Sequence, residues 1–353
     1  MEEQRIVFTQ DAGSALMEAL SAAQYDRLFV LADETTERFC LPRLNGAITA
    51  HSPEVITIKA GDTNKNIESL IHVWTHLSRH GATRHSLLIN VGGGMVTDLG
   101  GMAASTFKRG IRFINVPTTL LAMVDASAGG KTGINLGGLK NEVGTFCNAQ
   151  EVIIDTGFLE TLDSMNLRSG YAEMLKHSLL DSSQAWAGLM TFDLEQPDLK
   201  RLHRHVMESV EVKKRIVRED PHEKGLRKAL NLGHTAGHAI ESLALLRDKP
   251  VLHGYAVAWG LVCELYLSCK RLGFPHDTML QTVQFIKEHY GVYVFDCKQY
   301  ERLFELMTHD KKNENGVINF TLLAGIGDIH INQQATKDEI FDMLDFYRET
   351  MGC

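Results

Sequence analysis

The chain has 353 residues, of which 44% are hydrophobic and 23% charged, and its formal net charge is -8. This composition is typical of a folded globular protein, and the length favours two domains. The basic residues are scattered, which excludes the charge pattern of nucleic-acid binding or of attachment to an anionic membrane.

No run approaches the roughly 18 apolar residues of a membrane span, and the start MEEQRIVFTQ lacks the features of a secretory signal, so we expect a cytoplasmic protein. The six cysteines form no C-x-x-C pair, so we expect reduced, structural thiols.

The first half of the chain alternates β-rich runs with helical stretches. Strands are predicted at residues 27–33, 54–61, 86–94, 111–117 and 151–156, with an amphipathic stretch reaching about residue 84 and a helix after residue 94. This alternation is typical of a parallel α/β sheet. We therefore predict a Rossmann-like parallel-sheet domain over residues 1–160.

The β pattern nearly disappears between residues 161 and 311. Apolar residues at helical spacing predict helices at 165–180, 203–220 and 226–246. Two apolar runs separated by Gly325, Ile326 and Gly327 predict a hairpin, and the segment 338–351 predicts a terminal helix. Residues 161–353 are thus expected to form a second, mainly α-helical domain.

A glycine turn follows the strand predicted around residues 87–91. Gly92, Gly93 and Gly94 lead into a helix-compatible segment, and such a turn lets backbone amides approach a pyrophosphate at a helix N-terminus. The spacing is not G-x-G-x-x-G, so a tight strand-to-helix turn is an equal alternative. Asp33, at the end of an earlier strand, has the alternatives of a ribose acceptor and a helix N-cap.

A histidine pair indicates a metal site. His234 and His238 are four residues apart and therefore share a helix face, although no Glu follows His234 as H-E-x-x-H would require. His253 and Glu173 lie among apolar neighbours, where an isolated polar group is costly. A His/His/Glu set with one open position is typical of catalytic zinc, and the alternative is a group of ordinary core or surface residues.

Basic side chains recur inside apolar or glycine-rich motifs. Lys131 and Lys140 are predicted in glycine-rich loops, where each could be an ordinary solvated lysine or a clamp for an anion. Together with the glycine turn, the full set favours an anionic substrate: Arg109, Lys131, Lys140, Lys176, Lys213 and Arg227.

In order and content, these motifs resemble the 3-dehydroquinate synthase family and its sugar phosphate cyclase relatives over nearly the whole chain. The most specific segments are GGGMVTDLGG, FKRGIRFINVPTTLLAMVDASAGGKTGIN, GLKNEVGTF, YAEMLKH, LRKALNLGHTAGHAIE, LHG and HDKK. The resemblance implies an NAD-dependent and zinc-dependent enzyme, with cobalt as a possible metal, and a homodimer. The substrate would be a phosphorylated sugar acid, 3-deoxy-D-arabino-heptulosonate 7-phosphate, converted to 3-dehydroquinate and phosphate.

The resemblance also implies site residues. The metal ligands would be Glu173, His234 and His253, so His238 would face the substrate, in contrast to the pairing suggested by spacing. The residues implied for NAD are Asp33, Thr35, Asp62, Lys65, Gly93, Gly94, Asp98, Thr118, Thr119, Lys140, Phe158 and Thr161. Those implied for the substrate are Arg109, Asp125, Asn141, Lys213 and a lysine of HDKK, Lys311 or Lys312, and those implied for catalysis are Lys131, Lys176, Glu223, Arg227, Asn231 and His238.

One departure from the family pattern falls on a cofactor residue. Asp62 in GDTNK is one methylene shorter than the usual glutamate, so altered NAD affinity is expected. Two other enzymes stay open, namely a sister cyclase that makes a cyclitol and a metal-dependent polyol dehydrogenase. A polyol dehydrogenase would not need the dense set of basic residues, because its substrate carries no phosphate. A sugar-phosphate binding module would not need Glu173, His234 and His253 together.

Overall fold

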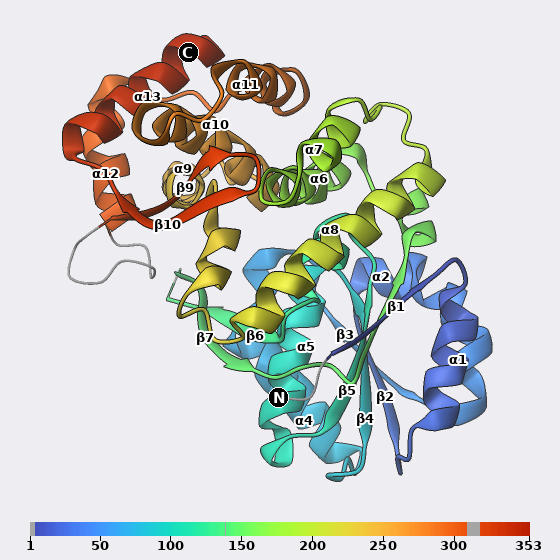
Figure 1. Cartoon of the computed structure of the whole chain (residues 1–353). Helices are drawn as coiled ribbons and strands as arrows, with labels where there is room; N and C mark the ends of the chain where they lie inside the picture. The colour runs from blue at the N-terminus through green and yellow to red at the C-terminus, as the bar shows by residue number, and fades with distance from the viewer. Residues whose placement is uncertain (1–3, 138, 309–317) are drawn as a thin grey trace. The chain divides into compact units, whose positions relative to one another are not determined.

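The computed structural model describes residues 4–137, 139–308 and 318–353. The chain divides into two compact units. The first comprises the described residues up to Asp163 together with Leu199–Val210, and the second comprises Ser164–Asp198 and the described residues from Glu211 onward. Figure 1 labels the elements in chain order.

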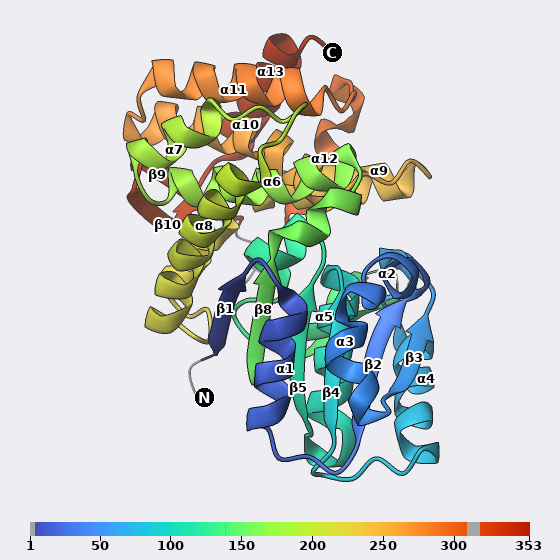
Figure 2. The same ribbon diagram turned by 90° about the vertical axis from the view of Figure 1, so that its right-hand side faces the viewer.

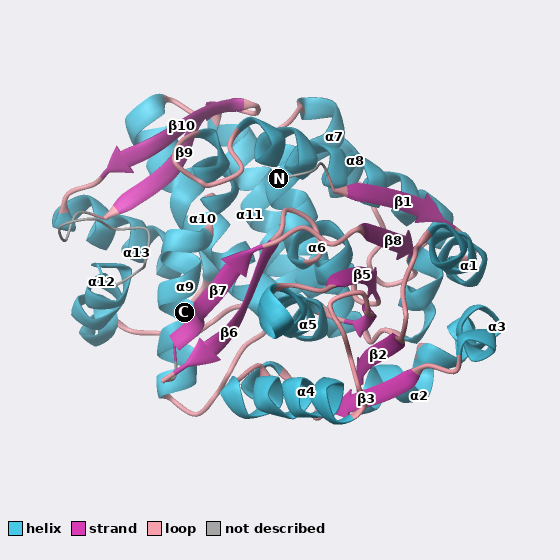
Figure 3. Cartoon of the chain, turned by 90° about the horizontal axis from the view of Figure 1, so that it is seen from below, coloured by secondary structure: helices cyan, strands magenta, loops and turns pink. Residues whose placement is uncertain are grey.

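The first unit is built on a parallel sheet of six strands with the order β1-β8-β5-β4-β2-β3. The strands are β1 (Arg5–Thr9), β2 (Leu28–Asp33), β3 (Glu54–Ile58), β4 (Leu87–Gly92), β5 (Arg112–Pro117) and β8 (Glu151–Asp155). The helices are α1 (Ala12–Ala22), α2 (Glu34–Phe39), α3 (Asn45–Ile48), α4 (Ile67–Arg79) and α5 (Gly94–Thr106). Figures 2 and 3 show α1 and α3 on one face of the sheet and α4 and α5 on the other, so the predicted α/β class is confirmed.

A hairpin in the first unit corrects one expectation. Lys131 and Lys140 do not lie in loops, because they belong to the antiparallel strands β6 (Lys131–Leu136) and β7 (Leu139–Phe146). Gly133 and Gly144 are opposite each other in this pair, and a Cβ atom on Gly144 would lie 2.2 Å from the carbonyl oxygen of Thr132. These glycines therefore mark close backbone approach between strands instead of a turn.

The second unit is mainly helical, as predicted. Its helices are α6 (Ser164–Leu179), α7 (Ser183–Met190), α9 (His234–Leu246), α10 (His253–Leu272), α11 (His276–Tyr290), α12 (Tyr300–Thr308) and α13 (Lys337–Met351), while α8 (Leu199–Glu219) begins in the first unit and ends in the second. The predicted hairpin is present as β9 (Asn319–Gly325) and β10 (Asp328–Gln334). Helix α10 is buried along most of its length and contacts α6, α9, α11, α13 and β9, so it forms the centre of this unit.

None of the helices within the described residues combines the length and the apolar character that crossing a bilayer would require.

Candidate active site

The carboxyl ends of three neighbouring strands bring the glycine turn and Asp33 to one edge of the sheet. Strands β2, β4 and β5 are adjacent and end at Asp33, Gly92 and Pro117. From β2 the chain moves to β3 on one side, whereas from β4 it moves to β5 on the other, so a topological switch point lies between β2 and β4. Parallel α/β sheets bind ligands at such points, and Gly93–Gly94 and Thr118–Thr119 directly follow these strands.

Helix α5 begins at this edge without a side-chain cap. Its N-cap is Gly93, which has no side chain to bond the amides of the first turn. Unpaired amides at the positive end of a helix dipole suit a phosphate group. The glycine turn therefore has the geometry that the dinucleotide interpretation needs.

Asp33 acts as a helix N-cap, which was one of its two predicted roles. Its Oδ1 accepts hydrogen bonds from the backbone amides of Thr35 at 2.8 Å and Thr36 at 2.9 Å, and the hydroxyl of Thr36 accepts one from the amide of Asp33. Both capping bonds go to one carboxylate oxygen. A ribose hydroxyl would have to use the other.

The buried ammonium of Lys65 bonds both Asp98, which is implied for NAD, and Asn141, which is implied for the substrate. The side chain of Lys65 is 5% exposed, and its ammonium lies 2.5 Å from Oδ2 of Asp98 and also donates to Oδ1 of Asn141. Nearby, the ammonium of Lys140 lies 3.2 Å from Oδ2 of Asp62. The hairpin β6–β7 is thereby tied to the turn before α4 and to α5.

The remaining candidates of the first unit are more dispersed. Phe158 is buried after β8, and Thr161 donates to its carbonyl oxygen at 3.2 Å. Asp125 lies in a π-helical turn, Ala122–Ala126, and Lys131 is an exposed residue at the start of β6. Arg109 follows α5 and precedes β5, so it lies at the opposite edge of the sheet, in a cavity lined by Thr83, Arg84, Thr106 and Lys108. The first unit does not bring Arg109 to the edge that carries Asp33 and the glycine turn.

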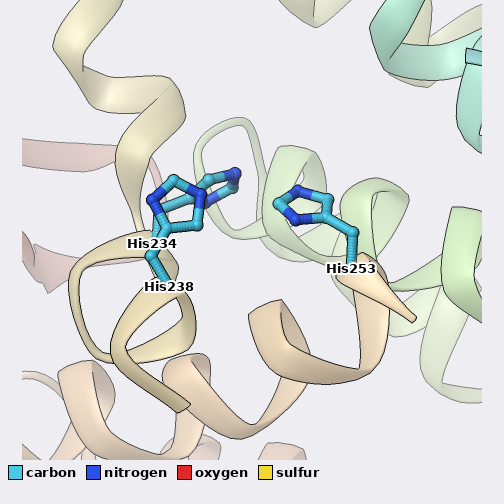
Figure 4. Close-up of side chains that lie close together, drawn as sticks. All are labelled: His234, His238 and His253. Atoms are coloured by element: carbon cyan, nitrogen blue, oxygen red, sulfur yellow. The ribbon is translucent and has the colours of Figure 1, made fainter. Parts of the chain in front are cut away.

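Three histidines converge in the second unit. Figure 4 shows His234 and His238 on α9 and His253 at the first position of α10. One ligand atom from each of the three rings lies within 4.8 Å of the others. Glu173 of α6 is fully buried, and its Oε1 is 3.4 Å from Nε2 of His234 and 3.4 Å from Nε2 of His253.

These distances fit a metal ion. A tetrahedral zinc site with bonds of about 2.0–2.1 Å places neighbouring ligand atoms about 3.3–3.4 Å apart. The carboxylate of Glu173 keeps this spacing to both imidazoles, and because it is fully buried its charge needs cationic partners, of which the ammonium of Lys176 is one. His238 is close enough to face a group bound at the same place.

Neighbouring acceptors orient the imidazoles of His234 and His253. Nδ1 of His234 lies 3.1 Å from the carbonyl oxygen of Leu232, and Nδ1 of His253 lies 3.3 Å from Oε2 of Glu241. A proton on each Nδ1 would donate to these oxygens and leave Nε2 as the ligand atom. Metal-binding histidines commonly have such partners.

The charges in this cluster shift one another's ionisation. Burial raises the pKa of Glu173, but the ammonium of Lys176 and then His234 outweigh it and hold that pKa well below its usual range. Burial lowers the pKa of His253, but Glu241 and Glu173 outweigh it and raise the pKa to about 9. Glu173 is therefore anionic at neutral pH, as a metal ligand must be.

Glycines allow helices α6, α9 and α10 to touch through their backbones. A Cβ atom on Gly254 would lie 1.8 Å from the carbonyl oxygen of Ser169 in α6, and one on Gly260 would lie 1.9 Å from that of Gly233 at the start of α9. Helices α6 and α9 thus both pack directly on the backbone of α10. This packing brings the candidate ligands Glu173, His234 and His253 together from three separate segments.

The other candidates of the second unit are buried or paired. Lys176 contacts the carboxylate of Glu173, and Lys213 is 6% exposed. Arg227 is 2% exposed and donates to the carbonyl oxygen of Pro221. The amide of Asn231 donates to Oε1 of Glu223 at 3.0 Å, which brings two predicted catalytic residues together. Lys311 and Lys312 lie outside the described residues.

Sequence reasoning missed two acidic residues around the candidate metal ligands. Glu241 contacts His253, and Glu264 accepts hydrogen bonds from the backbone amides at the start of α9. Both stand inside apolar helical segments, which is the signal that identified Glu173.

Comparison with known proteins gives consistent matches. A family model described as 3-dehydroquinate synthase N-terminal matches residues 55–169, and one described as 3-dehydroquinate synthase C-terminal matches residues 170–313. A 3-dehydroquinate synthase of Parabacteroides distasonis is 54% identical over 352 residues, which cover 100% of both chains.

Two solved structures have similar folds. The 2-epi-5-epi-valiolone synthase ValA of Streptomyces hygroscopicus, with NAD+ and Zn2+ bound, is 26% identical, with a TM-score of 0.86 over 99% of this chain and 98% of that one. A 2-deoxy-scyllo-inosose synthase complexed with carbaglucose-6-phosphate, NAD+ and Co2+ has a TM-score of 0.82 at 22% identity, over 98% and 96% of the two chains, which supports the fold alone.

Proposed function

Because the chain belongs to the 3-dehydroquinate synthase family, we propose that its residues perform that family's reaction with NAD and a metal ion. The enzyme is a lyase that converts 3-deoxy-D-arabino-heptulosonate 7-phosphate into 3-dehydroquinate and phosphate. The single observation that supports the chemistry best is the 3.4 Å spacing of Glu173 from both His234 and His253.

Glu173, His234 and His253 would hold the metal, with zinc or cobalt suited to this donor set. When bound, the metal supplies polarisation of a substrate oxygen, and NAD supplies a hydride acceptor that is restored in every turnover. Glu241 and the carbonyl oxygen of Leu232 fix the direction of the two imidazoles. His238 would face the substrate beside them.

The residues proposed for NAD belong to the first unit. The amides of α5 beside Gly93 and Gly94 would receive the pyrophosphate, with Thr118 and Thr119 along the same edge. Asp33 would accept a ribose hydroxyl. The other proposed contacts are Thr35, Asp62, Lys65, Asp98, Lys140, Phe158 and Thr161.

Buried cations of the second unit are proposed to bind the anionic substrate. In the second unit, Lys176, Lys213 and Arg227 are each at most 6% exposed, and buried cations favour an anionic ligand. They would stabilise the negative charge that develops as phosphate leaves. The residues of the first unit proposed for the substrate are Arg109, Asp125, Lys131 and Asn141, of which Arg109 lies at the edge of the sheet opposite Asp33 and the glycine turn.

Glu223 and Asn231 are proposed to handle a proton. The amide of Asn231 donates to Oε1 of Glu223, which orients the carboxylate so that its second oxygen can accept a proton. Lys311 or Lys312 is proposed at the phosphate end of the substrate.

The test is phosphate release from 3-deoxy-D-arabino-heptulosonate 7-phosphate by the purified enzyme, with absorbance followed for NADH. We expect release that needs both NAD and zinc, stops after EDTA treatment and leaves no net NADH. The Glu173→Gln variant removes the ligand charge at nearly constant volume and should release no phosphate. Steady NADH accumulation would refute the proposal in favour of a polyol dehydrogenase.

A sister cyclase is the second candidate, because ValA has a similar fold over nearly the whole chain. The 54% identity across the full length of a 3-dehydroquinate synthase favours the first candidate. Turnover of another sugar 7-phosphate, without turnover of the heptulosonate, would identify the sister activity.

We also propose a homodimer in the cytoplasm, from the family resemblance. Light scattering after size-exclusion chromatography tests the dimer, and cell fractionation tests the location.

A further inference from the structure

Glu264 is a buried carboxylate that caps a neighbouring helix. It belongs to α10, is fully buried, and accepts hydrogen bonds from the backbone amides of Gly233 at 2.7 Å, Thr235 at 2.9 Å and Ala236 at 3.1 Å. These amides belong to the N-cap and to the second and third positions of α9. Ser, Thr, Asp and Asn are the preferred N-cap residues because their side chains bond these amides, and Gly233 has no such side chain.

The capped turn carries a metal ligand. His234 is the first residue of α9 and stands between Gly233 and Thr235, both of which bond to Glu264. The backbone on each side of His234 is therefore held by one carboxylate. Because the ring of His234 is further directed by the carbonyl oxygen of Leu232, little freedom is left to this ligand.

The same helix that carries Glu264 also carries the opposite ligand. His253 is the first residue of α10, and Glu264 follows it about three turns later. Glu264 thus connects the start of α9 to the helix of His253. The arrangement is electrostatically favourable, because a negative charge lies at the positive end of the α9 dipole.

We propose that Glu264 is a positioning residue for the metal site, which sets the distance between His234 and His253 by holding the first turn of α9 on α10. The inference rests on the ligand set proposed above and deepens it. It gives a role to a charged residue in the buried interior of α10. Burying an apolar residue there would cost less free energy than burying a charge that has no partners.

The test compares metal binding with stability. In Glu264→Gln the side chain keeps its size but loses its charge and places an NH2 group against backbone donors. We expect a 10- to 100-fold loss of zinc affinity in a chelator competition, as for other partners of metal ligands. We also expect altered visible absorption bands in the cobalt-substituted protein, because these bands report ligand geometry.

Thr336→Ala is the matched control. Thr336 caps α13 in the same unit through a bond from the amide of Glu339, so its loss should lower the unfolding temperature without changing zinc affinity or the cobalt bands. If Glu264→Gln behaves like this control, with zinc affinity within twofold of the parent, the inference is wrong. Should Glu264→Gln fail to fold, Glu264→Asp, which shortens the cap by one methylene, is measured in the same way, and unchanged zinc affinity overturns the inference there too.

Failure of the underlying ligand set has a separate signature. If His253→Ala retains the parent's zinc affinity and cobalt bands, the proposed ligands are wrong whatever the Glu264 variants do. If His253→Ala abolishes metal binding and the Glu264 variants leave it unchanged, only the positioning role is refuted.

Discussion

A close backbone contact between α9 and α10, beside the proposed metal ligands, predicts a strong effect of a single methyl group. In Gly260→Ala, the added Cβ atom would lie 1.9 Å from the carbonyl oxygen of Gly233 and 2.7 Å from the amide nitrogen of Gly237. Ordinary contact begins at 3.4 Å, so α9 and α10 would have to separate by about 1.5 Å, the difference between 3.4 and 1.9 Å. Both obstructing atoms are backbone, so no side-chain rotation can relieve the clash.

The size of the effect follows from that separation. Overpacking of this kind costs about 1–3 kcal/mol in the free energy of unfolding. Metal sites tolerate errors of only about 0.2 Å in ligand distance, so binding must either restore the original packing or accept poor geometry. If the strain opposes metal binding in full, the zinc affinity falls roughly 5- to 150-fold.

The assay measures both quantities on one variant. Urea unfolding of the metal-free protein gives the change in stability, and chelator competition gives the zinc affinity. Gly46→Ala is the control, since Gly46 also lies in a helix but no atom within 4 Å would meet its Cβ. A Gly260→Ala protein whose unfolding free energy and zinc affinity both match those of Gly46→Ala would refute the reasoning.

Three further predictions follow from single interactions. Asp33→Ala removes the cap of α2 and should cost about 1 kcal/mol in urea unfolding while also weakening NAD binding in a fluorescence titration; a loss of stability with unchanged NAD affinity would leave Asp33 only its capping role. Lys65→Met removes the ammonium that bonds the carboxylate of Asp98 and should destabilise the first unit by about 1.5–3 kcal/mol, to be measured by calorimetry and contradicted by a change under about 0.5 kcal/mol. In metal-free protein, burial lowers the pKa of His253 but Glu241 and Glu173 raise it to about 9, above the unfolded value of about 6.5. The contribution of His253 to stability is therefore complete below about pH 6.5 and is lost as the pH rises through 9. Zinc affinity should rise over the same interval, because a histidine must be neutral to bind the metal. A zinc affinity that is flat from about pH 6.5 to 9 would contradict this prediction.

Local patterns in the sequence were sufficient for much of the fold. The run from Leu87 to Val91 and its glycine turn predicted β4 and the start of α5, because a buried strand and a helix start each leave a short-range signature. The C-terminal hairpin around Gly325–Gly327 was predicted for the same reason. Lys131 and Lys140 were misplaced in loops, because glycines at a close strand pairing look like turn residues when the partner strand is unknown.

Spacing alone was less informative for the candidate metal site. The four-residue interval between His234 and His238 correctly predicted a shared helix face but favoured the pair as joint ligands. The family resemblance instead implies Glu173, His234 and His253 as ligands and assigns His238 to the substrate. Glu173 belongs to α6 and His253 to α10, and no local pattern specifies that side chains from separate helices lie 3.4 Å apart. That distance depends on tertiary packing, which single-sequence patterns do not encode.

The helix contacts around the site suggest why poor helix formers are retained in its helices. Gly237, Gly254 and Gly260 lie inside α9 and α10, and each glycine lowers helix stability by about 1 kcal/mol relative to alanine. Their benefit is geometric, because a Cβ atom at any of the three would come within 2.8 Å of a backbone atom of an adjoining segment. The local cost is thus offset only if close packing of α6, α9 and α10 is itself required. The fully buried Glu173 provides that requirement, because it must stay within reach of two imidazoles and a cation. We therefore expect the effects of substitutions at these glycines and at the proposed ligands on metal binding to be non-additive.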